Sequence, residues 1–303
     1  MAIGRLPGCT TINVSDPLFA HGKSWPALNP SICQIDDGFL LNVRHVSYSI
    51  LPNGDYFSPD NRWENLNRAL WLSKDLERLR EHHFDGIAAS EHPQGHADVR
   101  LFRVGDEVHF VSNVFFHGNT TFLQGRYDTR LNHLSGTIIV IQPTLPLVFR
   151  SEEKNWAFFK SDGQLFAVYE WSPLRIFEIV DNVVVAMTVN DRVPTFFKGM
   201  RGTSGGQRVG DEFWFVAHFT IYGEPRDYLH VLVALDATTF APSRFSRAFK
   251  FLGEAVEFCT GLAVTSTQVL FAYGVWDRNA LVSAVPIAVV ERLLRKPRKN
   301  DFD

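Results

Sequence analysis

Residues 98–116 read DVRLFRVGDEVHFVSNVFF. The stretch starts on a polar residue, runs through an apolar strand to the turn Gly105-Asp106, and returns as a second strand rich in aromatic residues. Alternating apolar residues on both sides of a glycine-containing turn predict a β-hairpin. The chain repeats this order, and the five starts are Asn29-Pro30-Ser31-Ile32, Asp98-Val99-Arg100-Leu101-Phe102, Lys154-Asn155-Trp156, Arg201-Gly202-Thr203-Ser204 and Glu257-Phe258-Cys259.

The spacing of the five starts gives repeats of roughly 50 residues, which predict an all-β, five-bladed β-propeller. We expect a single domain over residues 1–303 in which the N-terminal segment closes the ring and residues 286–294 form a short C-terminal helix. The innermost strands of a propeller surround one channel, so the polar starts should meet in a central funnel. The expected blades are at about 29–96, 97–150, 151–200, 201–256 and 257–290.

One segment fits two kinds of secondary structure. Residues 65–76 have the composition of an amphipathic helix, but they parallel residues 227–236 of the fourth repeat. We predict an outer strand for this segment, because the repeat outweighs local helix propensity.

Composition narrows the class of protein. The chain of 303 residues has a formal net charge of −3, which argues against a nucleic-acid or anionic-membrane surface. No apolar run approaches the roughly 18 residues of a membrane span, and residues 1–14 lack the apolar core of a signal peptide. Cys9, Cys33 and Cys259 have no metal-type spacing, so we interpret them as reduced thiols of a cytoplasmic protein.

The polar residues at and near the strand starts form a mixed set. Carboxylates, amides and aromatic faces together suit a sugar, because its hydroxyls need polar partners and its ring face stacks on an aromatic. A surplus of cations suggests a bound anion as well, such as phosphate or a carboxylate. The candidates are the carboxylates Asp98 and Glu257, the cations Arg44, Arg100, Lys154 and Arg201, the amides Asn29, Asn42 and Asn155, and the nearby aromatics Trp156, Trp171, Tyr273 and Trp276.

Three short motifs at the starts of the first three blades resemble those of a known family. Asn29-Pro30, Ala97-Asp98-Val99-Arg100 and Lys154-Asn155 resemble, in order and spacing, the motifs of the first three blades in glycoside hydrolase family 130 and related β-mannosyl-transferring propellers. The chain also resembles propeller modules found with bacterial glycosyltransferases. That second resemblance rests on Arg201–Gly206, Glu257–Ala263 and Asp277-Arg278-Asn279-Ala280 after Tyr273-Gly274-Val275. Together the resemblances cover roughly residues 29–281.

The resemblance implies roles for individual residues. Asp98 would be the general acid, delivering its proton to the leaving oxygen by way of a substrate hydroxyl. Phosphate, water or an acceptor sugar would then attack the anomeric carbon with inversion. Arg100, Lys154 and Asn155 would hold the sugar or the anion, and His218 falls where the family often places a site histidine. The full set of substrate-binding candidates is Asn29, Arg44, Arg100, Lys154, Asn155, Arg201, His218, Tyr273, Asp277 and Arg278.

The chain departs from the family pattern at Ala97, where the family has Glu. A hydrolase needs a second carboxylate as base, and Glu257 is the strand-opening candidate for it. A phosphorylase needs no such base, because phosphate is itself the nucleophile. No metal-ligand spacing stands out, so we expect no metal or cofactor, with inorganic phosphate or a sugar nucleotide as possible co-substrate.

Three functions remain open at this point. The first is inverting glycosyl transfer on an oligosaccharide, with β-mannosides as the first substrate class to test. The second is a non-catalytic glycan-binding propeller that associates with a polysaccharide-building glycosyltransferase. Such a binding module would tolerate Ala97 in place of the family Glu. The third is a protein-interaction scaffold. Fold by itself does not choose among them, because propellers host unrelated functions.

Overall fold

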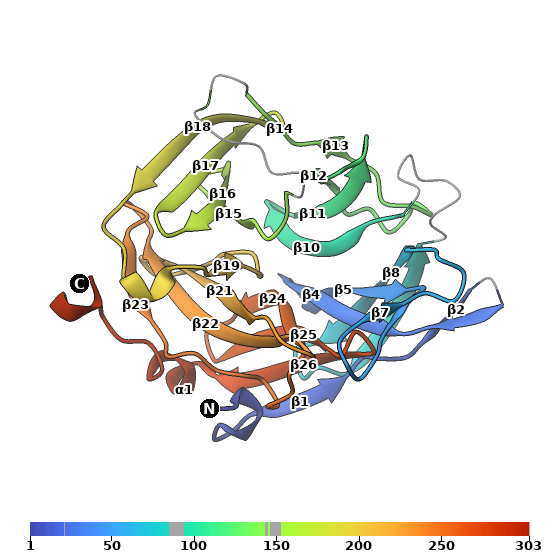
Figure 1. Cartoon of the computed structure of the whole chain (residues 1–303). Helices are drawn as coiled ribbons and strands as arrows, with labels where there is room; N and C mark the ends of the chain where they lie inside the picture. The colour runs from blue at the N-terminus through green and yellow to red at the C-terminus, as the bar shows by residue number, and fades with distance from the viewer. Residues whose placement is uncertain (21, 85–93, 143–144, 146–152, 303) are drawn as a thin grey trace.

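Five β-sheets surround a common axis in the computed structural model, which describes residues 1–20, 22–84, 94–142, 145 and 153–302 (Figure 1). The sheets follow one another round the ring in chain order, from the blue first sheet to the red fifth (Figure 1). The predicted all-β, five-bladed propeller is confirmed.

Each blade is a twisted sheet whose first strand lies innermost. Blade one consists of β4 (Ala27–Ile35), β5 (Gly38–Val46), β8 (Asn65–Ser73) and β9 (Arg78–Phe84). Blade two consists of β10 (Ala97–Val104), β11 (Glu107–Phe116), β12 (Asn119–Arg126) and β13 (Thr137–Ile138). Blade three consists of β15 (Ala157–Ser161), β16 (Gln164–Trp171), β17 (Leu174–Val180), β18 (Val183–Asn190) and β14 (Val140–Ile141).

The last two blades follow the same plan. Blade four consists of β19 (Arg201–Gly202) and β20 (Gln207–Val209), which both pair with β21 (Glu212–Ile221), followed by β22 (Asp227–Asp236) and β23 (Pro242–Phe245). Blade five consists of β24 (Glu257–Val264), β25 (Gln268–Val275), β26 (Asn279–Pro286) and β1 (Thr10–Asn13).

The N-terminal strand belongs to the last sheet. β1 pairs antiparallel with β26, with Thr10 opposite Ala284 and Asn13 opposite Leu281. The N-terminal segment therefore supplies the outer strand of blade five and joins the two ends of the ring. This pairing covers an edge that β26 would otherwise expose.

The hydrophobic core is divided among the five interfaces between neighbouring blades. Apolar residues of facing sheets alternate inward and interdigitate there, which accounts for the aromatic content of the chain. The five clusters include Leu41 with Leu270 between blades one and five, Trp71 with Phe110 between one and two, Phe122 with Phe177 between two and three, Phe159 with Phe215 between three and four, and Trp214 with Phe271 between four and five. Fully burying one such side chain contributes about 1.5–3 kcal/mol.

The ambiguous segment is a strand, because residues 65–73 form β8 within blade one. The expected C-terminal helix is present as α1 (Ile287–Glu291). Short 3-10 helices cover Ile3–Arg5, Thr195–Phe197 and Lys299–Asp301. Among the residues described, no helix is long and apolar enough to cross a membrane.

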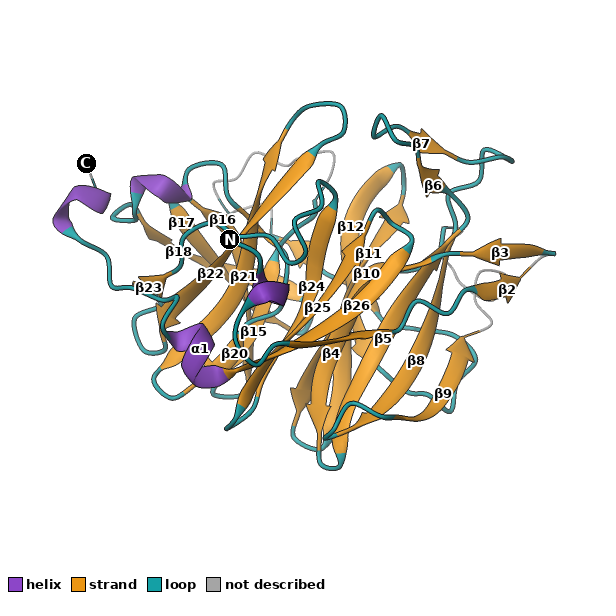
Figure 2. Cartoon of the chain, turned by 90° about the horizontal axis from the view of Figure 1, so that it is seen from below, coloured by secondary structure: helices purple, strands orange, loops and turns teal. Residues whose placement is uncertain are grey.

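Two small hairpins lie outside the blades. One is β2 (Leu18–Ala20) with β3 (Lys23–Trp25), and the other is β6 (Ser49–Ile50) with β7 (Tyr56–Phe57). Both project from the side of the ring next to blade one (Figure 2). The ion pair between Lys23 and Asp60 joins the first hairpin to the segment that follows the second.

Candidate active site

The backbone near the starts of the innermost strands is distorted in a way that aims side chains at the axis. Asn29 and Asp98 have φ angles of 41° and 46°, where β4 and β10 shift register against their neighbours. Asn155 and Asp277 are also left-handed, at 65° and 47°. Asn and Asp tolerate this conformation better than other non-glycine residues, and such strained positions cluster at functional sites.

These four residues line one cavity of about 220 Å³ at the centre of the ring. Strands or turns from all five blades contribute to it. Its lining residues are Asn29, Arg44, Tyr48, Tyr56, Asp98, Lys154, Asn155, Arg201, His218, Thr220, Tyr222, Arg226, Tyr228, Val256, Phe258 and Asp277. Eight residues predicted from the sequence therefore meet here, namely Asn29, Arg44, Asp98, Lys154, Asn155, Arg201, His218 and Asp277.

Asp98 is held as a carboxylate. Its Oδ1 accepts hydrogen bonds from Arg44 Nη1 at 2.7 Å and from Asn29 Nδ2 at 3.1 Å. Burial alone would raise the pKa of Asp98, but the charges of Arg44 and Arg100 and these bonds outweigh burial and lower the pKa.

Asp277 is the second carboxyl group of the cavity and has the opposite tendency. Arg44 Nη2 donates to the Tyr48 hydroxyl at 3.2 Å, and that hydroxyl donates to Asp277 Oδ2 at 3.4 Å. Burial raises the pKa of Asp277 to about 6; Arg44 opposes this rise and the negative charge of Asp98 adds to it. Two carboxyl groups linked through Arg44 and Tyr48 thus differ in their readiness to hold a proton.

The cavity has more cationic than anionic side chains. Arg44, Lys154, Arg201 and Arg226 line it, against Asp98 and Asp277 among the described residues. Arg44 contacts Asp98 directly, and the described lining as a whole holds more cations than carboxylates. Such a set suits an anion, because charge-assisted hydrogen bonds to phosphate or carboxylate are strong and directional.

His218 is a neutral member of the site. It is 1% exposed and lies opposite His230 on β22. Burial lowers the pKa of His218 well below its usual value, and the nearby His230, Arg201 and Arg100 lower it further. A neutral imidazole accepts or donates a hydrogen bond without adding charge, which suits contact with a sugar hydroxyl.

Glu257, expected as a second catalytic carboxylate, is not in the cavity, and this expectation is wrong. Its side chain is 0% exposed and accepts hydrogen bonds of 2.5–3.0 Å from the backbone N–H groups of residues 251–254. A carboxylate surrounded by four amide donors stabilises the loop before β24 and has no path to a substrate.

Arg100 lies beneath the cavity instead of lining it. The side chain is 1% exposed, its Nε donates to the Thr203 carbonyl at 2.5 Å, and its Nη1 donates to the Asp98 carbonyl at 3.1 Å. It therefore connects blade two to blade four under Asp98. The expectation of direct substrate contact is corrected to a positioning role.

Three further candidates also lie elsewhere. Tyr273 is fully buried, stacks on Phe251 with centroids 4.2 Å apart, and its hydroxyl pairs with that of Ser283. Asn42 is buried, where its side-chain amide bonds to Asn67 and to Tyr127. Arg278 is exposed and packs over Trp276 at 5.7 Å. None of the three lines the cavity, because each side chain is directed into packing or solvent.

Sequence reasoning missed several lining residues. Tyr48, Tyr56, Tyr222, Arg226 and Tyr228 all border the cavity. Tyr228 is the second residue of the predicted strand 227–236, and Tyr48 follows the end of β5 by two residues, so attention to strand starts and ends could have found them. Tyr222 and Arg226 sit in the β21–β22 connection, and Tyr56 sits in a hairpin outside the repeat, where spacing carries no signal.

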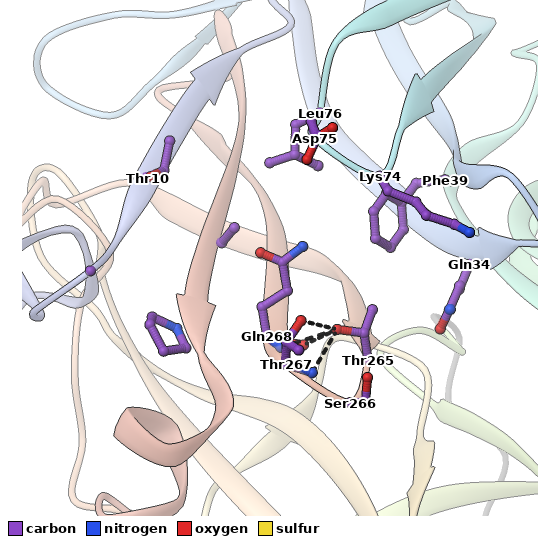
Figure 3. A pocket seen from close by; sticks show the side chains of 14 residues that line it. Thr10, Gln34, Phe39, Lys74, Asp75, Leu76, Thr265, Ser266, Thr267 and Gln268 are labelled. Atoms are coloured by element: carbon purple, nitrogen blue, oxygen red, sulfur yellow. Dashed lines mark hydrogen bonds between the residues drawn. The ribbon is translucent and has the colours of Figure 1, made fainter.

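A larger cavity of about 680 Å³ lies at the far end of the inner strands (Figure 3). Gln34, Lys74 and Asp75 of blade one face the turn Thr265–Thr267 and Gln268 of blade five across it. Its lining combines hydroxyls and amides with Lys74 and Asp75, both of which are exposed. The paired carboxyl groups and cation surplus that suit group transfer occur in the smaller cavity.

The chain is similar to known proteins in its fold, although its sequence matches no family model and no curated protein. A scan against family models and a search of curated protein sequences match nothing to this chain. The β-1,2-mannobiose phosphorylase of Listeria innocua, solved with β-1,2-mannobiose, superposes with a TM-score of 0.62 at 13% identity, over 95% of this chain and 93% of that one. The chain has the fold of the family 130 mannoside phosphorylases.

Other solved structures share the family 130 fold. A structure from work on family 130 glycoside hydrolases that target β-1,2-mannosidic linkages in Candida mannan has a TM-score of 0.59 at 12% identity, over 91% of this chain and 90% of that one. A GDP-Man-dependent mannosyltransferase of Leishmania mexicana has a TM-score of 0.51 at 9% identity, with the same two coverages. At these identities the likeness establishes the fold alone.

The described part of the chain holds no group of three His, Cys, Asp or Glu side chains placed to bind a metal ion. Cys33 and Cys259 are buried free thiols, and burial raises the pKa of Cys33 to about 12. They contribute to packing between blades.

Proposed function

We propose that this chain is an inverting glycoside phosphorylase that acts on β-mannosides. The observation that carries the proposal is the combination, in one cavity, of two carboxyl groups with divergent proton affinity and a surplus of cations. A phosphorylase needs one acid for the leaving oxygen and a binding site for an anionic nucleophile. β-Mannoside is chosen as the first substrate class on the resemblance of the blade motifs and on the shared fold.

In the proposed reaction, inorganic phosphate binds to Lys154, Arg201 and Arg226. A phosphate oxygen attacks the anomeric carbon, the bond from that carbon to the bridging oxygen breaks, and a carboxylic acid gives its proton to that oxygen. Inversion converts a β-linkage into an α-sugar 1-phosphate and releases the second sugar with a free hydroxyl. All atoms of both substrates are retained in the two products.

The proton donor in this proposal is Asp277 instead of Asp98. A general acid works best with a pKa near the working pH, and Asp277 has a pKa of about 6. Asp98 has a lowered pKa and accepts bonds from two donors, so it suits holding sugar hydroxyls as a carboxylate. The surplus of cations in the cavity favours phosphorolysis over hydrolysis, because it suits an anionic nucleophile.

A non-catalytic glycan-binding propeller is the second candidate, favoured by Ala97 at the position of the family Glu. It would keep the amide and tyrosine contacts and need no proton donor. Association with a separate glycosyltransferase belongs to this candidate.

The deciding experiment is product analysis with β-linked mannobioses, with and without inorganic phosphate, beside GDP-mannose plus an acceptor. Sugar 1-phosphate that forms only with phosphate supports the proposal, and ³¹P NMR identifies its anomer. Transfer from GDP-mannose would instead indicate a synthetic transferase. No turnover of any donor together with saturable glycan binding would favour the recognition module.

A further inference from the structure

The side chains of β25 become smaller toward the funnel on the face that packs against blade one. Leu270 and Ala272 belong to the hydrophobic cluster between blades one and five, and Gly274 is the next residue on that face. Phe271 and Tyr273, which alternate with them, belong to the cluster between blades four and five. The strand therefore presents leucine, alanine and finally no side chain to blade one as it approaches the funnel.

Gly274 leaves room for Asn29 of blade one, whose strand β4 lies against β25 (Figure 1). A Cβ at position 274 would overlap Asn29 Oδ1 and would lie 2.7 Å from the Asn29 backbone nitrogen. The φ of Gly274 is not left-handed, so its backbone conformation would accept an alanine. Glycine is required at this position by the neighbouring asparagine, because any larger residue would occupy the space that the carboxamide holds.

The carboxamide of Asn29 has one favourable orientation. Its Nδ2 donates to Asp98 Oδ1 at 3.1 Å, and its Oδ1 lies against Gly274. This Oδ1 is buried and accepts no hydrogen bond from the described residues. The reversed amide would place an oxygen against the Asp98 carboxylate, which can only accept. The missing side chain at position 274 therefore permits the orientation in which Asn29 donates to Asp98.

The backbone of Asn29 uses the same space. Asn29 has a φ of 41°, where β4 shifts register between Leu28 and Ser31. Gly274 pairs across β24–β25 with Phe258, which lines the funnel, whereas Gly274 itself does not line it. Gly274 thus lies directly behind the wall of the funnel, and its effect on a ligand can only be indirect.

We infer that Gly274 is a positioning residue for the sugar-binding carboxylate: the space left by its missing side chain holds the carboxamide of Asn29, and Asn29 in turn holds Asp98. These contacts connect blade five through blade one to blade two, so the fit between the first and last blades affects Asp98. That Asp98 holds sugar hydroxyls rests on the proposed function, whereas the effect of Gly274 on Asp98 does not.

The test is Gly274→Ala, which adds one methyl group and requires no left-handed φ. The methyl group must displace the Asn29 carboxamide and break its hydrogen bond to Asp98. Burial raises the pKa of Asp98, and the charges of Arg44 and Arg100 together with this bond lower it. Loss of the bond should therefore raise the pKa of Asp98 above its wild-type value.

Three measurements follow the variant. ¹³C NMR of protein labelled at the aspartate carboxyl carbons gives the pKa without any substrate, and Asp98→Asn assigns the signal. Calorimetry gives the affinities for mannose and for inorganic phosphate, and the melting temperature reports folding. We expect mannose to bind about tenfold more weakly, since a hydrogen bond to a charged group is lost. Phosphate should bind within about twofold of wild type, because its proposed ligands Lys154, Arg201 and Arg226 lie at blades three and four.

Gly125→Ala is the matched control. Gly125 lies on β12 of blade two without a left-handed φ, and a Cβ there would overlap the Ser135 carbonyl oxygen and lie 2.9 Å from Phe110 Cε1. Both variants force a methyl group against an oxygen, so both should lower the melting temperature. Only Gly274→Ala should change the pKa of Asp98 and the affinity for mannose.

Asn29→Gly tests the same contact from the other side, because glycine keeps a φ of 41° and removes the carboxamide. It should raise the pKa of Asp98 as Gly274→Ala does, and adding Gly274→Ala to it should change neither this pKa nor mannose affinity further. If Gly274→Ala alone does not fold, recovery of folding in the double variant supports the inference, and a double variant that is equally unfolded overturns it.

The inference is also overturned by a wild-type pKa of Asp98 in folded Gly274→Ala, or by the same rise of this pKa in Gly125→Ala. It can fail separately from the proposed function. A raised pKa of Asp98 in Gly274→Ala, with no sugar 1-phosphate formed by wild type, retains the positioning role and overturns the phosphorylase. Phosphorolysis by wild type, with unchanged kcat/KM and unchanged pKa of Asp98 in Gly274→Ala, retains the phosphorylase and overturns the positioning role.

Discussion

Asp98 and Asp277 have the same side chain, and Arg44 and Tyr48 connect them, yet their protons behave differently. Asp98 contacts Arg44 directly at 2.7 Å, which stabilises the carboxylate. Asp277 is reached only through Tyr48 and is buried beside the charge of Asp98, so its neutral form is favoured. The direct contact of Arg44 with Asp98, and not with Asp277, thus favours a charged Asp98 and a protonated Asp277.

This division predicts different responses to substitution. Asp277→Asn should lower kcat/KM on β-mannobiose by about 100-fold or more, because the leaving oxygen loses its proton donor. The same variant should stay within about tenfold of wild type on an aryl β-mannoside whose phenol leaves without a proton. Asp98→Asn should lose activity on both, since it holds the sugar. If Asp98→Asn is instead the variant rescued by the aryl leaving group, the donor is Asp98.

A pH profile tests the same residue. The donor must be protonated, so kcat/KM on β-mannobiose should fall as pH rises above about 6, tenfold per unit, as Asp277 ionises. Because the pKa of Asp277 is raised, the protonated and reactive form of this residue becomes more abundant as the pH falls. kcat/KM should therefore increase when the pH is lowered from about 7 to about 6. The aryl mannoside should lack this limb. A profile that is flat between pH 5 and 8 on both substrates would contradict the assignment.

At the scale of elements, the hairpin β6–β7 lies outside the five blades and still contributes Tyr56 to the lining of the funnel.

Gly54→Val should raise KM for β-mannobiose by about tenfold, since a side chain at this left-handed position meets Pro225 and lifts the hairpin away. KM for phosphate should change less than KM for mannobiose.

Gly118→Val is the matched control for that variant. Gly118 joins β11 to β12 with a φ of 82°, and a Cβ there would meet nothing within 4 Å. Both variants carry a similar backbone strain of about 1–2 kcal/mol, but only Gly54→Val disturbs a contact, the one with Pro225. A KM for mannobiose that rises equally in both would show that strain, not the Pro225 contact, is responsible.

The blade hairpins could be predicted from the sequence, whereas the outer hairpins could not. Strands such as β10–β11 and β24–β25 show alternating apolar residues around a polar turn, and that alternation is a local property of the chain. Residues 47–64 lack an apolar alternation, because β6 and β7 have only two residues each and pack on aromatic side chains. Their position depends on contacts with blade four.

At the scale of the whole molecule, the net charge of −3 coexists with a cationic funnel, so the attraction for an anion is local. Local charge pairs at a partly open cavity are screened by salt, with a Debye length of about 10 Å at 0.1 M and 3 Å at 1 M. KM for phosphate should therefore rise several-fold between 0.05 and 0.5 M sodium chloride, while the affinity for mannose stays constant. Equal salt sensitivity of both ligands would contradict an anion site.

The sequence by itself determined the number of sheets, their order and eight residues of the funnel, because strand periodicity and repeat spacing are written along the chain and because inner strands all start at one axis. It could not assign Glu257, whose four amide partners come from a loop that has no pattern of its own. Nor could it find Arg226, which lines the funnel from the β21–β22 connection. Those depend on which turns meet across the ring, and only tertiary packing brings segments as distant as residues 54 and 225 into contact.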